Sequence, residues 1–121
     1  MKRVLIADDN EGARHAARKV LEMAGHEVIE ARDGSEALVL AVEHKPDVAV
    51  FDMTMPGMHG HEVCAELHKR TDELATLPVI LLTGVEELMG GALAAGAGVQ
   101  RYLNKPVNPR ELIDAINELT S

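Results

Sequence analysis

Five short apolar runs alternate with longer stretches whose apolar residues recur at helical spacing, and this alternation constrains the fold most strongly. The runs cover residues 4–7, 28–29, 48–51, 79–82 and 102–103. The first, third and fourth are apolar at every position, which is typical of strands buried on both faces of a sheet. The second and fifth are shorter and weaker, as expected for edge strands. Strands and helices that alternate through short connections predict a parallel sheet with helices on both faces, a three-layer α/β/α sandwich of five strands.

Three of the intervening stretches predict helices, because apolar residues recur at helical spacing within 13–24, 37–42 and 63–67. Gly25 is the predicted C-terminal cap of the first helix, since glycine readily adopts the left-handed conformation that ends a helix. Ser35 is the candidate N-cap of the second helix, where its hydroxyl would accept a bond from a free backbone amide.

Two further helices are predicted, and they differ in strength. The last has Asn108 as its predicted N-cap and Pro109 at its first helical position, and its apolar pattern continues to the end of the chain. The other, near 86–97, carries Gly90 and Gly91 in its middle, and each glycine costs about 1 kcal/mol relative to alanine. We expect this helix to be weakly held, which suits a segment that exchanges between two arrangements. A tolerant surface helix explains the glycines equally well.

Composition bounds the class of protein. A chain of 121 residues has room for one domain, predicted to span 1–121. Its 20 acidic and 12 basic side chains give a net charge of −8, which argues against nucleic acid and anionic membranes as partners. Cys64 is the only cysteine, so we expect a reducing compartment and a small core residue rather than a disulfide. The sequence displays no targeting or membrane-spanning segment, and we expect a cytoplasmic protein.

Polar residues follow four of the five predicted strands. Asp8 and Asp9 follow the first strand, Asp52 the third, Thr83 the fourth, and Lys105 comes just after the fifth. In open α/β sheets ligands bind beyond the carboxyl ends of the strands, so we expect three carboxylates, a hydroxyl and an ammonium to converge there. One polar loop residue would be ordinary, but polar residues at four of five strand ends predict a site.

The residue types at this edge indicate a particular chemistry. Three carboxylates packed together repel one another and raise each other's pKa unless a cation lies among them. Oxygen ligands alone favour Mg²⁺, and no set of cysteines and histidines has the spacing of a zinc site. A carboxylate can attack phosphorus, and Thr83 and Lys105 could pair with the phosphoryl oxygens. The residues therefore predict a Mg²⁺-dependent acyl-phosphate site with Asp52 as the candidate acceptor.

Four sequence elements, in this order and at these strand ends, resemble one family. They are Asp8-Asp9, the segment 52–60 (DMTMPGMHG), Thr83, and the segment 102–106 (YLNKP). Over essentially its whole length the chain is similar to the receiver domain of bacterial two-component response regulators. The resemblance implies a flavodoxin-like sheet with strand order 2-1-3-4-5.

The resemblance also implies how the acidic residues act. Asp52 takes a phosphoryl group from the phosphohistidine of a sensor histidine kinase or histidine phosphotransfer protein, or from a small donor such as acetyl phosphate. Asp9, Asp52 and the backbone carbonyl of Thr54 are the implied direct ligands of Mg²⁺, and Asp8 acts mainly through water.

The remaining motif residues have implied roles around the phosphoryl group. Thr83 and Lys105 bind its oxygens, and the bond between Lys105 and Pro106 is expected to be cis. Tyr102 is the implied aromatic switch, which turns inward when Thr83 moves toward the phosphate. A downstream protein is expected to bind the face formed by the helix near 86–97, the fifth strand and the last helix.

Two positions of the family tune how fast water removes the phosphoryl group. They lie two residues after Asp52, where this chain has Thr54, and two residues after Thr83, where it has Val85. Valine cannot orient an attacking water molecule. We therefore expect a longer-lived phosphorylated form than in chemotaxis-type receivers, which often carry polar groups there.

The resemblance implies a signalling module that turns over no independent substrate, and three alternatives compete with it. A phosphatase of the haloacid-dehalogenase type needs a second aspartate two residues after the nucleophile, where this chain has Thr54. A nucleotide- or flavin-binding module of the same fold is disfavoured, because neither common glycine-rich phosphate motif occurs. A receiver-like domain that works without phosphate is the third alternative, although every residue that the chemistry needs is present.

The histidines of the third helical region raise the question of a second metal site. His59, His61 and His68 could suggest transition-metal ligation, but solvated histidines on a helix face are the favoured interpretation. Three methionines in the same loop are expected to be packing residues rather than a redox sensor.

Overall fold

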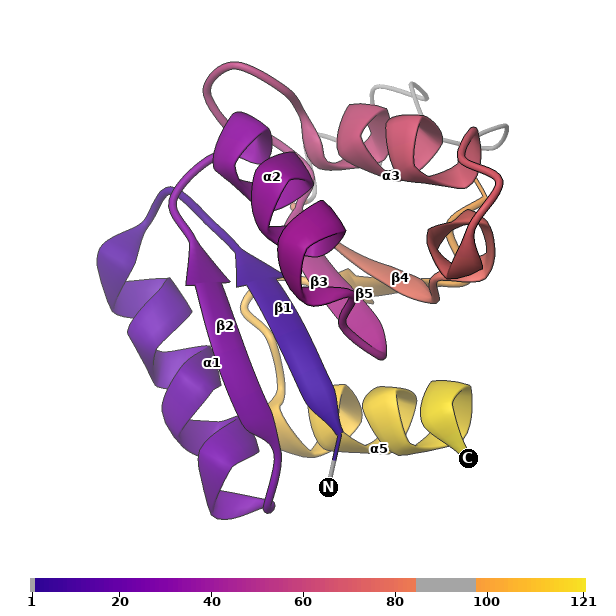
Figure 1. Ribbon diagram of the computed structural model, residues 1–121. Helices are drawn as coiled ribbons and strands as arrows, with labels where there is room; N and C mark the ends of the chain where they lie inside the picture. The colour runs from indigo at the N-terminus through magenta and orange to yellow at the C-terminus, as the bar shows by residue number, and fades with distance from the viewer. Residues whose placement is uncertain (1, 85–97) are drawn as a thin grey trace.

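The computed structural model describes residues 2–84 and 98–121. Val85 and the predicted helix with Gly90 and Gly91 lie outside the described residues. The elements, shown in Figure 1, are β1 (Arg3–Ala7), α1 (Glu11–Met23), β2 (Glu27–Ala31), α2 (Gly34–His44), β3 (Val48–Asp52), α3 (Gly60–His68), a 3-10 helix η1 (Glu73–Thr76), β4 (Val79–Thr83), β5 (Arg101–Asn104) and α5 (Pro109–Thr120). No helix in these parts of the chain is long and apolar enough to cross a bilayer.

The strands form a parallel sheet of order β2-β1-β3-β4-β5, which confirms the predicted fold and strand order. In Figure 1, α2 and α3 lie on one face of the sheet and α1 and α5 on the other. Consecutive residues of the central strands alternate between two buried clusters: Leu5 and Phe51 face α2 and α3, whereas Ile6 and Val50 face α1 and α5. The continuous apolar runs are explained by this burial on both faces.

The edge strands are β2 and β5, as predicted, but β2 is not short. It has five residues, the same length as β1, although only 28–29 were recognisable as a strand. Glu27 and Glu30 interrupt its apolar run, and both form ion pairs in the structure. An edge strand tolerates such residues because helices cover it only in part.

The helix ends agree with the sequence at two places and differ at one. Asn108 caps α5 by accepting bonds from the backbone amides of its first turn, and Gly25 follows the end of α1 with a φ of 93°. The predicted cap of α2 is wrong: Asp33 accepts the bond from the amide of Glu36 at 2.8 Å, and Ser35 lies inside the helix. Aspartate and serine cap comparably well, so only the backbone path selects Asp33.

Candidate functional site

Three carboxylates meet at the carboxyl edge of the sheet. Asp8 and Asp9 follow β1 and Asp52 ends β3, and these two strands are hydrogen-bonded neighbours. One carboxylate oxygen from each residue lies within 4.8 Å of the others. Asp8 is 5% exposed and Asp52 4% exposed, while Asp9 is open to solvent. Among the described residues this is the only such cluster of potential metal ligands.

Lys105 brings a positive charge to this cluster. Its ammonium Nζ lies 2.5 Å from Oδ1 of Asp52, and its backbone amide donates a 2.8 Å hydrogen bond to the carbonyl of Thr83. That hydrogen bond holds the loop after β5 against the end of β4. The Lys105–Pro106 peptide bond is cis, the isomer expected from the resemblance.

The hydroxyl of Thr83 is buried at the end of β4. Thr83 ends β4, is 0% exposed, and its Oγ1 has no hydrogen-bond partner among the described residues. The backbone amide of Met53 donates to the carbonyl of Leu82 at 3.0 Å, which keeps the end of β4 beside the segment after Asp52. A buried hydroxyl without a bond costs free energy, so this group is suited to donate to a ligand.

The loop that carries Thr54 is held at both ends. The amide of Gly60 donates to the carbonyl of Met53 at 3.0 Å and closes the loop where α3 begins. Gly34, at the start of α2, packs directly against the carbonyl of Met58, where a Cβ atom would clash. Thr54 itself is exposed, whereas the side chain of Met53 is buried, as expected for packing.

Burial and a second carboxylate shift the acidity of Asp8. Removal from water, and to a lesser extent the nearby carboxylate of Asp52, raise the pKa of Asp8 from 3.8 to about 6, against the lowering effects of the hydrogen bond from the Asn10 amide and of the charge of Lys105. A cation among the carboxylates would offset both the burial and the repulsion from Asp52, since it favours the charged forms of the carboxylates. Oxygen donors of this kind suit Mg²⁺, so the residues fit the expected ion.

Without metal, the protein is expected to lose stability as the pH rises from about 4 to about 6. The folded-state pKa of Asp8, about 6, lies above its ordinary value of 3.8. The stabilisation that Asp8 gains from holding its proton in the folded state is therefore fully present below pH 3.8 and is lost as the pH rises through about 6. The linkage amounts to at most about 3 kcal/mol. Urea unfolding in the presence of EDTA, compared between the wild type and Asp8→Asn, isolates the effect. A difference between the two that does not change with pH would contradict it.

The two aromatic residues lie on the same face of the sheet and differ in burial. Phe51 precedes Asp52, and its side chain is fully buried in the cluster that faces α2 and α3. Tyr102 of β5 is half-buried and packs against that same cluster, opposite Leu81 in the strand register. Tyr102 is therefore the aromatic residue with room to change its exposure.

The histidines and the cysteine belong to the packing around α3. His59 caps α3 together with Glu62, and the rings of His59 and His61 stack with centroids 5.9 Å apart. His68 is not solvated as predicted, because its Nε2 lies 2.8 Å from the carbonyl oxygen of Leu77. Cys64 is fully buried, which confirms the predicted core position and raises the pKa of its thiol to about 12.

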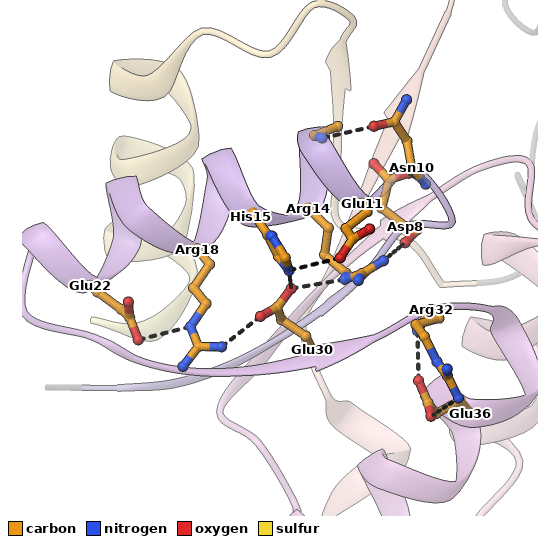
Figure 2. Close-up of polar contacts among 11 residues, drawn as sticks. Asp8, Asn10, Glu11, Arg14, His15, Arg18, Glu22, Glu30, Arg32 and Glu36 are labelled. Carbon is orange, nitrogen blue, oxygen red and sulfur yellow. Dashed lines mark hydrogen bonds and ion pairs between the residues drawn. The ribbon is translucent and has the colours of Figure 1, made fainter.

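One buried charge beside the site was not anticipated from the sequence. Arg14 of α1 is 7% exposed and contacts both the carbonyl of Asp8 and the carboxylate of Glu30 (Figure 2). The available signal was an arginine among the alanines of α1 together with a glutamate in β2. Neither is informative alone, because arginine on an amphipathic helix usually faces water.

Comparison with known proteins agrees with this fold. The family model described as response regulator receiver domain matches residues 4–117. Protein PilH of Pseudomonas aeruginosa is 34% identical over 117 residues, which cover 97% of this chain and 96% of PilH. The alkaline phosphatase synthesis transcriptional regulatory protein PhoP of Bacillus subtilis is 36% identical over 92% of this chain. The chain spans only 45% of PhoP and about half of several other curated relatives.

Solved structures are similar over nearly the whole chain. A response regulator receiver domain protein from Clostridium thermocellum matches with a TM-score of 0.90 and 33% identity, covering 99% of this chain and 94% of that structure. The chemotaxis protein CheY4 of Vibrio cholerae matches with a TM-score of 0.84 and 31% identity, covering 98% of each chain. The similarity therefore includes every strand that contributes to the acidic cluster.

Proposed function

The chain belongs to the response regulator receiver domain family of two-component signalling, and on that premise we propose that residues 1–121 act as one domain that accepts a phosphoryl group on Asp52. Receiver domains are signalling modules rather than enzymes that turn over a substrate of their own. The observation that carries the proposal is the pairing of Asp52 with Lys105 inside a cluster of three carboxylates.

The proposed reaction is the transfer of a phosphoryl group from a donor to Asp52. An oxygen of the Asp52 carboxylate attacks the phosphorus of a partner's phosphohistidine or of acetyl phosphate. A new oxygen–phosphorus bond forms, the bond to the donor breaks, and its electron pair leaves with the imidazole nitrogen or the acetate oxygen. Lys105 then pairs with a phosphoryl oxygen instead of Asp52, and the hydroxyl of Thr83 donates to another.

Mg²⁺ supplies positive charge where the phosphoryl oxygens gather when it is bound. Asp9, Asp52 and the backbone carbonyl of Thr54 are the proposed direct ligands, with Asp8 acting through water. The raised pKa of Asp8 supports this assignment, because a buried carboxyl beside a second one favours a bound cation.

The proposed output is a change in a protein-binding face. The hydrogen bond from the Lys105 amide to the Thr83 carbonyl links the end of β4 to the segment after β5. Movement of Thr83 toward a phosphoryl group would therefore shift β5, which carries Tyr102. We propose that Tyr102 turns inward and changes the face formed by β5 and α5, which binds a downstream protein. The donor is a sensor histidine kinase or histidine phosphotransfer protein of the cytoplasm, and neither nucleic acid nor membrane is a proposed direct partner.

Acetyl phosphate tests the proposal without a partner protein. Incubation with acetyl phosphate and Mg²⁺ is expected to add the mass of one phosphoryl group to the intact protein. Hydroxylamine should remove it, because it cleaves acyl phosphates, and EDTA should prevent its addition. Phosphoryl uptake that is equal in EDTA, or that hydroxylamine does not reverse, would overturn the proposal.

A further inference from the structure

Arg14 is the only buried basic side chain among the described residues. A buried guanidinium is tolerated only when charged or polar partners surround it, because its removal from water is costly. The apolar residues of its own helix do not supply such partners. The contacts that Arg14 makes across to β1 and β2 therefore explain why it is buried.

Those contacts join the turn after β1 that carries Asp8 and Asp9, the acidic turn, to the edge strand β2. Nη1 of Arg14 donates to the backbone carbonyl of Asp8 at 2.9 Å, and Nε donates to the carboxylate of Glu30 at 2.8 Å. The planar guanidinium can serve both acceptors from one fixed orientation. Figure 2 shows Arg14 between these two residues, with Glu30 also approached by Arg18 at 2.6 Å and by His15 at 3.4 Å.

Glu30 is well suited to anchor this arrangement. Its side chain is only 14% exposed. Burial would raise the pKa of Glu30, but hydrogen bonds from Arg18 and Arg14 outweigh that effect and hold the pKa below its ordinary value. Glu30 thus stays ionised and fixes the guanidinium of Arg14 from the side opposite the acidic cluster.

Arg14 completes a set of bonds that fixes the orientation of Asp8. The amide of Asp8 donates to the carbonyl of Ala31 at 3.2 Å, and Oδ1 of Asp8 accepts from the amide of Asn10 at 2.9 Å. The carbonyl of Asp8 accepts from Arg14. The peptide that connects Asp8 to Asp9 is therefore held through its carbonyl oxygen. The orientation of this peptide sets the position from which the side chain of Asp9 extends.

We infer that Arg14 is a positioning residue for the metal site: it holds the Asp8–Asp9 peptide so that both carboxylates face the cation. This inference rests on the proposed Mg²⁺-dependent function of the same site. Groups that orient metal ligands typically change metal affinity by 10- to 100-fold when they are replaced. Because Arg14 acts through the backbone rather than on a ligand atom, we expect an effect at the lower end of that range.

The test compares two arginines of the same helix that share Glu30. Arg14→Met removes the contact with Asp8, whereas Arg18→Met removes the same charge from α1 without touching the acidic turn. Mg²⁺ is titrated into the full chain while amide chemical shifts are followed. The Kd for Mg²⁺ is expected to rise about tenfold in Arg14→Met and less than about twofold in Arg18→Met.

A second readout separates positioning from general destabilisation. The rate of phosphorylation by acetyl phosphate is measured against Mg²⁺ concentration. Arg14→Met should need more Mg²⁺ to reach half of its maximal rate, yet its rate at saturating Mg²⁺ should stay within about twofold of the wild type. If Arg14→Met does not fold, Arg14→Lys keeps the charge without the planar fork and should weaken Mg²⁺ binding by about threefold.

The possible failures are distinguishable. Equal Mg²⁺ affinity in the two methionine variants, or unchanged affinity in a folded Arg14→Met or Arg14→Lys, overturns the role of Arg14 alone. A wild type that binds Mg²⁺ but takes up no phosphoryl group overturns the proposed function and leaves the affinity comparison valid. A wild type that does not bind Mg²⁺ overturns both.

Discussion

Asp52→Asn is expected to abolish phosphoryl uptake from acetyl phosphate, because an amide oxygen is a far weaker nucleophile toward phosphorus than a carboxylate oxygen. The substitution keeps the size of the side chain in a position that is 4% exposed, so the sheet should remain intact. Intact-protein mass spectrometry after incubation with acetyl phosphate and Mg²⁺ gives the result directly. The expected outcome is no mass increase, against near-complete conversion of the wild type.

A matched control separates loss of the acceptor from loss of a negative charge. Asp114→Asn makes the same chemical change on the exposed surface of α5, where Asp114 pairs with Arg110 at 3.3 Å. This variant should be phosphorylated at the wild-type rate. Phosphoryl uptake by Asp52→Asn, mapped to any other residue, would show that Asp52 is not the acceptor.

Gly60→Ala is expected to destabilise the fold by about 3 kcal/mol, the upper end of the range typical of overpacking at a buried position. A Cβ atom at Gly60 would lie 2.5 Å from the backbone oxygen of Asp52 and 2.7 Å from Cδ2 of Leu81. Neither neighbour can withdraw easily, because one belongs to β3 and the other is a fully buried core side chain. Urea or thermal unfolding followed by circular dichroism measures the loss.

Gly12 provides the opposite case within the same chain. It lies on the exposed side of α1, and the nearest atom to a Cβ there is Oδ1 of Asn10 at 3.4 Å. Gly12→Ala should therefore stabilise the protein by roughly 0.5–1 kcal/mol through helix propensity. If Gly60→Ala were as stable as the wild type, the close approach of α3 to the end of β3 would be incorrect.

The order of elements and the central strands were predictable because burial on both faces leaves an uninterrupted apolar run. The gathering of the polar residues of the candidate site could be predicted as well, since parallel strands bring their carboxyl ends to one edge. Asp52 and Thr83 end strands there, and Asp8, Asp9 and Lys105 follow strands. The resemblance then added the strand order and the expected roles. These inferences depend on local patterns, which a single sequence carries clearly.

The features that were missed depend on contacts between distant segments. The full length of β2 could not be predicted, because Glu30 interrupts the apolar pattern. Its ion pair with Arg14 of α1, which accommodates the charge in the strand, is visible only in the structure. The cap of α2 was misassigned by two residues because Asp33 and Ser35 differ little in capping ability. His68 could not be distinguished from a surface histidine until its bond to the carbonyl of Leu77 was known.

The ion pair between Lys105 and Asp52 has a consequence for charge balance at the edge of the sheet. Three carboxylates face one ammonium, so the resting site holds surplus negative charge in a place where two of the acids are shielded from water. A bound divalent cation would cancel that surplus, and under the proposed function a phosphoryl group on Asp52 would restore part of it while drawing Lys105 away from its first partner. The domain would then sense phosphorylation as a redistribution of charge around a nearly fixed backbone, with Lys105 as the group that changes partner.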